Sequence, residues 1–164
     1  MSAGNVLILD GGNVSTSPTT KYQTEAAATA INYGEPVKLK VAGSQYVIPL
    51  ADAEPVVGTT TAVCGIAMSN STQTSTADGT IEVFVPLPGM IYLCAAKSSA
   101  AVDTQAEYDA LVGKPVLFDL TGGVYTVDTA STNAADGLVI RDLNIAKYPG
   151  KVAFSLRQSG TTNN

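Results

Sequence analysis

The chain has 164 residues and few charges: Asp, Glu, Lys and Arg make up 14% of it, and 9 basic against 14 acidic residues give a formal net charge of −5. The charges are scattered, whereas nucleic-acid binding needs a clustered cationic surface. No apolar run approaches the roughly 20 residues of a membrane-spanning helix, and the N-terminus lacks the basic flank and apolar region of a signal peptide. We therefore expect a protein made in the cytoplasm, with neither nucleic acid nor a membrane as a partner.

The first 30 residues differ from the rest of the sequence. Residues 6–9 form a short apolar run, Gly11 and Gly12 follow it, and residues 13–20 show neither helical nor strand periodicity. One interpretation is a disordered leader. The other is an extended N-terminal arm, residues 1–30, that orders when its apolar run adds to an exposed sheet edge of a partner. The candidate contact residues of this arm are Val6, Leu7, Ile8 and Leu9.

Strand patterns begin at about residue 33. Apolar residues alternate with lysines over residues 37–41, and a turn containing glycine leads to the β-rich residues 45–50, so these two segments predict a hairpin. Residues 62–68 predict a further strand, buried in the core.

A second hairpin is predicted at the centre of the β core. Residues 81–85 and 90–95 are apolar and β-rich, and Pro88 and Gly89 lie between them. Pro88 fixes φ for the second position of a tight turn, and Gly89 supplies the positive φ that a type II turn then requires. We therefore expect these two segments to pair with each other.

One short helix is predicted, at about residues 104–112. Thr104 and Glu107 have the spacing of a capping box, Gly113 stands where a C-terminal glycine belongs, and Pro115 prevents the helix from continuing.

The remaining sequence predicts more strands and a flexible tail. Residues 116–120 and 124–127 predict a hairpin, and residues 138–143 and 151–156 predict the last two strands. Short strands separated by regular turns favour a mainly-β fold: a single-domain β-barrel or β-sandwich of about eight strands. The predicted β domain covers residues 31–157, and the tail covers residues 158–164.

The sequence contains no arrangement of residues that is typical of an enzyme. It has no histidine, which excludes Ser-His-Asp and Cys-His sites and the commonest zinc ligand. No phosphate-binding glycine motif or EF-hand loop is present. The acidic residues that could hold a cation or act as a carboxylate pair are Asp52 with Glu54, Asp103 with Asp109, and Asp136. Isolated acidic residues of this kind are typical of solvated loops. We therefore predict no catalytic site, no cofactor and no metal.

The two cysteines, Cys64 and Cys94, each lie in an apolar strand pattern. Two buried, reduced thiols that behave as small hydrophobic groups are the favoured interpretation. A cross-strand disulfide is the alternative, and it requires Cα atoms within about 7 Å of each other.

Three motifs follow one another along the sequence: Gly34-Glu35-Pro36-Val37, then Cys64-Gly65-Ile66-Ala67, then a strand from Gly79 that runs into Pro88-Gly89 and residues 90–95. Their order resembles that of the small capsid decoration proteins, or head cement proteins, of tailed bacteriophages. In that family a Gly-Asp/Glu-Pro-Val opening, a Gly-Ile/Val-Ala strand and a Val-x-Val-x-Gly hairpin follow one another.

The resemblance implies a non-enzymatic structural protein on the outer surface of a virion. Its partners would be the major capsid protein and other copies of itself, commonly as a homotrimer, with an extended arm that touches several coat subunits. One alternative is another structural phage component, such as a tail-tube or coat-associated β domain. A secreted adhesin or carbohydrate-binding domain is a second alternative, which the lack of tryptophan and of a signal peptide disfavours.

Overall fold

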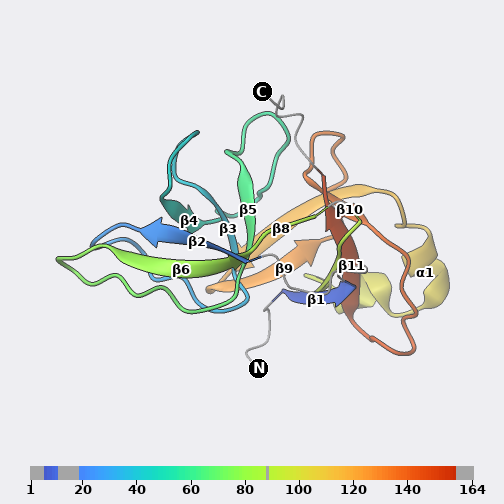
Figure 1. Ribbon diagram of the computed structural model, residues 1–164. Coiled ribbons are helices and arrows are strands. Elements are labelled where there is room, and N and C mark those ends of the chain that lie inside the picture. The colour runs from blue at the N-terminus through green and yellow to red at the C-terminus, as the bar shows by residue number, and fades with distance from the viewer. Residues whose placement is uncertain (1–5, 11–18, 88, 158–164) are drawn as a thin grey trace. The chain divides into compact units, whose positions relative to one another are not determined.

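The computed structural model describes residues 6–10, 19–87 and 89–157 (Figure 1). The fold is mainly β, as predicted, with two antiparallel sheets and one short α-helix. The chain divides into two compact units. Unit 1 comprises the described residues of Met1–Gly12, Ala51–Thr59 and Gly89–Asn164, and unit 2 comprises those of Asn13–Leu50 and Thr60–Pro88.

Unit 1 contains a six-stranded sheet in the order β1-β7-β11-β10-β8-β9. All of its pairings are antiparallel. Its strands, in chain order, are β1 (Leu7–Asp10), β7 (Ile91–Ala95), β8 (Pro115–Thr121), β9 (Val124–Asp128), β10 (Leu138–Ile140) and β11 (Lys151–Leu156).

Unit 2 contains a five-stranded sheet in the order β2-β6-β5-β3-β4. Its two edge strands meet at one point, where Gln23 N donates to Gln45 O at 3.0 Å beside a parallel bridge from Gln23 to Tyr46. The described strands form no closed barrel. In chain order they are β2 (Thr19–Thr24), β3 (Pro36–Leu39), β4 (Val47–Pro49), β5 (Val63–Ala67) and β6 (Gly79–Phe84).

The predicted central hairpin is wrong, although both of its strands exist. β6 pairs with β2 and β5 in unit 2, whereas β7 pairs with β1 and β11 in unit 1. The segment between them, Pro86-Leu87-Pro88, has two prolines, which lack the N–H groups that a continuing ladder needs. β6 therefore ends at Phe84, and its long pairing is with a strand that comes earlier in the chain.

The other two predicted hairpins are confirmed, and β10 pairs with β11, which was not predicted. β3 pairs with β4. β8 pairs with β9 through Gly122 and Gly123, which have φ values of +60° and +79°. Positive φ at both central residues is what a type I′ hairpin requires, and two glycines adopt it without a steric penalty.

The predicted helix is present but shorter than expected. α1 spans Gln105–Asp109 and begins with the expected capping box, in which the Thr104 and Glu107 side chains each accept a hydrogen bond from the other's backbone N–H. A 3₁₀ helix, η1 (Ser99–Val102), precedes it. Tyr108 is the buried residue of α1.

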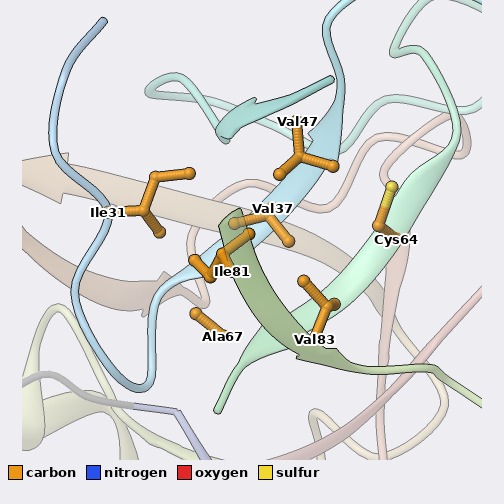
Figure 2. Packing of buried hydrophobic residues seen from close by; sticks show 7 residues of the cluster. All are labelled: Ile31, Val37, Val47, Cys64, Ala67, Ile81 and Val83. Atoms are coloured by element: carbon orange, nitrogen blue, oxygen red, sulfur yellow. The ribbon is translucent and has the colours of Figure 1, made fainter. Parts of the chain in front are cut away.

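The two units have different cores. In unit 1 large aromatic side chains dominate: Phe118 packs edge-on against Phe154 with ring centroids 5.3 Å apart, and Tyr92 stacks on Phe154 at 5.7 Å. In unit 2 the buried cluster is built from aliphatic and small side chains that converge from β3, β4, β5, β6 and the segment before β3 (Figure 2). Its members are Ile31, Val37, Val47, Cys64, Ala67, Ile81 and Val83.

Eleven strands are described, against about eight predicted, and two of them lie in the region where an extended arm was predicted. β1 pairs with β7, and β2 pairs with β6 in unbroken register over six residues. β2 has the sequence Thr-Thr-Lys-Tyr-Gln-Thr, so it lacks the apolar alternation that marks a half-buried strand. Residues 1–5 and 11–18 of that arm, and the predicted tail, residues 158–164, lie outside the described residues.

Candidate functional site

The loop carboxylates that the sequence offered as cation ligands instead hold loops of unit 1. Asp52 Oδ1 accepts a hydrogen bond from Leu120 N at 2.9 Å, and Glu54 Oε2 accepts one from Ala51 N at 2.8 Å. Asp136 is buried, and its Oδ2 accepts from Ser131 Oγ and from Asn133 N, both at 3.0 Å. Glu54 and Asp136 therefore have a structural role within their own loops, and Asp52 connects its loop to β8.

The second acidic pair, Asp103 and Asp109, lies at the two ends of α1 and does not form a shared site. The Asp103 carboxyl shares a hydrogen bond with Glu107, which raises the pKa of Asp103 and lowers that of Glu107. Asp109 Oδ1 accepts from Gln105 Nε2 at 2.7 Å, and the same nitrogen donates to Leu143 O. These contacts fix the short helix to the loop after β10.

One charged cluster in unit 1 was not predicted. Lys97 Nζ lies 2.7 Å from Asp119 Oδ1 and 2.9 Å from Asp128 Oδ2, and thus links the two strands of the β8–β9 hairpin. The hydrogen bond from Lys97 lowers the pKa of Asp119. Lys97 is distant in the sequence from both partners, and only the strand pairing brings the three side chains together.

Both cysteines are free and buried, one in each unit. Burial raises the pKa of the Cys64 thiol to about 11 and that of the Cys94 thiol to about 12. Because the thiolate is the reactive form, neither group has the properties of a nucleophile near neutral pH. This agrees with the prediction of two buried thiols.

Among residues 6–10, 19–87 and 89–157, no group of three or more Cys, Asp or Glu side chains has the arrangement of a metal site. No helix in that part of the chain is long and apolar enough to span a membrane.

The strand edges of the two sheets remain as places where another polypeptide could pair. Two edges are obstructed. β4 is only three residues long and ends in Pro49, and the outer edge of β9 is occupied where Lys97 N donates to Val127 O at 2.9 Å. Short strands and prolines are common means of preventing edge-to-edge association.

β1 and β2 form the other two edges, and at the outer edge of β2 Gln23 N donates to Gln45 O. β2 is six residues long and unbroken in register, with Thr19, Thr20 and Lys21 exposed. β1 contains three of the four predicted contact residues, Leu7, Ile8 and Leu9, while Val6 precedes it and is only 2% exposed. Leu7 lies opposite Leu93 of β7, and Ile8 lies opposite Tyr92.

Among the side chains that the structure describes, the large apolar ones that are exposed are Tyr33, Val41, Leu87 and Val112. Val41 is the most exposed of them, at 58%, and it lies between β3 and β4. Single exposed apolar residues are common on soluble proteins and do not by themselves define a binding site.

No family model, curated protein or solved structure matches this chain.

Proposed function

We propose that this chain is a structural virion protein that binds the outer surface of a tailed-phage capsid and stabilises the shell, with the major capsid protein and further copies of itself as partners. The proposal begins from the sequence motifs that resemble decoration proteins. It is supported by where three of those motifs lie in unit 2.

Three motifs, separated in the sequence, come together as neighbouring strands of one sheet. Residues 34–37 lead into β3, residues 64–67 lie in β5, and the segment from Gly79 is β6. β5 pairs with β3 on one side and with β6 on the other. The three motifs that carry the resemblance are therefore neighbours in the fold. Three short motifs that occurred by chance would have no reason to be neighbours. The last motif, residues 90–95, includes β7 of unit 1.

The backbone geometry explains why the motif at residues 64–67 contains a glycine. Gly65 has φ +136°, and a Cβ atom on it would lie 1.8 Å from Phe84 O of β6. Gly65 also lies opposite Val37 at the point where the β3–β5 register shifts. Only glycine fits where two strands approach so closely.

A capsid role also fits the physical character of the chain. A protein that binds only the assembled shell stabilises that shell by linkage, and many weak contacts repeated over a symmetric lattice add through avidity. Neither effect requires a catalytic group or a cofactor. The long polar edge of β2 and the low charge content are compatible with extended contacts to other proteins.

Co-sedimentation with phage shells tests the proposal. The purified chain is mixed with empty heads assembled from the coat protein encoded in the same genome, before and after shell expansion, and the mixture is centrifuged through a sucrose cushion. We expect saturable binding to one or both forms and a higher shell melting temperature. Unassembled coat protein is the control, and it should not retain the chain. Failure to co-sediment with either form of shell would overturn the proposal.

A further inference from the structure

Strand β1 differs in origin from the other strands of its sheet. The other five strands of unit 1 come from one continuous stretch of chain, residues 91–156. β1 comes from residues 7–10, and all five strands of unit 2 lie between it and β7 in the sequence. The sheet of unit 1 is therefore complete only when β1, which comes from near the N-terminus of a chain, pairs with β7.

The contact between β1 and its sheet is small. It comprises three opposed residue pairs, and its register shifts between Ile8 and Asp10. The other side of β7 is held more regularly, by four consecutive pairs with β11. Four residues do not form a stable strand alone, so β1 is the strand of this sheet that separates most easily.

The place that β1 occupies nevertheless needs an occupant. β7 has the sequence Ile-Tyr-Leu-Cys-Ala, and Tyr92, Leu93 and Cys94 are buried. Without β1, the outer backbone groups of this apolar strand would be unpaired, and an exposed apolar edge promotes association with other strands. Val6, just before β1, is also buried and would lose its contacts.

We propose that the outer edge of β7 is a strand-acceptor site for a second copy of this chain. The β1 strand of the second copy pairs with β7 of the first copy, in the place of the first copy's own β1. The pairs Leu7–Leu93 and Ile8–Tyr92 are the same whether β1 comes from the same chain or from another. The sheet is therefore equally complete in both cases, and exchange of an identical element is a low-cost route to oligomers. Because each copy both donates and accepts a strand, exchange links two copies reciprocally or a larger number head to tail.

The concentration of chains decides between the two arrangements. Pairing within one chain competes at an effective concentration that the length of the connection sets. The connection from β1 to β2 is residues 11–18, which contain Gly11 and Gly12. Exchange is consequently favoured where copies are crowded together. The inference goes beyond the proposed function, because it requires no capsid and can be tested on the chain alone.

Disulfide trapping between two differently tagged copies tests the exchange. Both copies carry Cys64→Ala and Cys94→Ala; one adds Leu7→Cys and the other adds Leu93→Cys. They are co-expressed, so that exchange is not limited by unfolding of a finished protein, then oxidised and captured through one tag. We expect a disulfide-linked heterodimer, at least about tenfold more abundant than in a control with Thr126→Cys on β9 in place of Leu93→Cys, because strand pairing raises the effective concentration of the two thiols.

A single chain that carries both Leu7→Cys and Leu93→Cys provides the second measurement. If this chain closes an internal disulfide while the mixed pair yields no more heterodimer than the control, β1 pairs only within its own chain and the proposal is wrong. If neither disulfide forms in folded protein, the β1–β7 register itself is wrong and the proposal fails with it. Shell binding by the unmodified chain would be unaffected by either result, so the proposed function is judged separately.

Discussion

The two units reach similar β architectures through opposite packing strategies. Unit 1 fills its core with large rings, and it pairs the hydroxyl of its buried Tyr108 with Arg141 O and with Ala153 N. Unit 2 uses small aliphatic side chains and, at Gly65, brings two backbones so close that no side chain fits. From this comparison we expect the stability of unit 1 to be most sensitive to the removal of a buried side-chain group. The stability of unit 2 should be most sensitive to the addition of one. Each unit has one buried cysteine, so the rate at which a thiol reagent labels that cysteine measures the opening of that unit alone.

The largest expected effect is in unit 2, from Gly65→Ala. The added methyl group would lie 1.8 Å from Phe84 O, so β5 and β6 must separate. We expect a loss of about 3 kcal/mol or more in the free energy of unfolding, measured by urea denaturation, and faster labelling of Cys64 by a thiol reagent. Gly43→Ala is the matched control: its φ is +76° but its surroundings are open, so it should cost only about 1–2 kcal/mol of backbone strain. Equal losses in the two variants would contradict the close approach.

In unit 1 we expect the next largest effect from Tyr108→Phe. Tyr108 Oη donates to Arg141 O at 2.9 Å and accepts from Ala153 N at 2.8 Å. Removing the hydroxyl leaves the buried Ala153 N and the part-buried Arg141 O without that partner, which costs about 1–3 kcal/mol. Tyr92→Phe is the control, because the hydrogen bond of the buried Tyr92 hydroxyl is a long one, 3.5 Å to Met90 Sδ. Cys94 labelling should accelerate in the first variant and change little in the second.

The difference between the units was only partly predictable from sequence. Local signals succeeded: the capping box at Thr104 and Glu107, the Gly122-Gly123 turn and the buried thiols all depend on neighbouring residues or on simple apolarity. Long-range pairing was not predictable in the same way. β2 has no strand periodicity because its side chains are mostly exposed, and β6 and β7 are both apolar, so their pattern does not reveal that they belong to different sheets.

The candidate site shows the same division. The apolar run at residues 6–9 was visible because apolar residues are rare near the N-terminus, but its partner strand β7 was not, since more than 80 residues separate them. The Lys97 cluster carried no sequence signal at all. Asp119 and Asp128 lie on adjacent strands of a hairpin, and only the pairing of that hairpin brings both carboxylates within reach of one ammonium group.

A smaller, stabilising effect is expected in both units from replacing an alanine that has positive φ. Ala27 in unit 2 has φ +59° and Ala53 in unit 1 has φ +57°, a conformation that costs a residue with a Cβ atom about 1–2 kcal/mol. Glycine relieves that strain but gains freedom in the unfolded chain, so Ala27→Gly and Ala53→Gly should each stabilise by up to about 1 kcal/mol. Ala110→Gly, at φ −68°, is the control and should destabilise. Thermal denaturation of the three variants measures the sign, and a destabilised Ala53→Gly would refute the assignment.

The smallest effect concerns the pH dependence of unit 1. The hydrogen bond from Lys97 lowers the pKa of Asp119 below its ordinary value, so the ionised carboxylate stabilises the fold above the unfolded-state pKa of about 3.9, and this contribution is lost as pH falls through the lower folded-state pKa. Lys97→Met should therefore raise the Asp119 pKa, measured from its carboxyl carbon chemical shift, and should move the start of acid unfolding to higher pH. Lys40→Met is the matched control, because it removes an ion pair with Glu25 on the surface of unit 2 and should leave the Asp119 titration unchanged. If Asp119 titrates identically in the wild type and in Lys97→Met, the ammonium group does not hold the β8–β9 hairpin in solution.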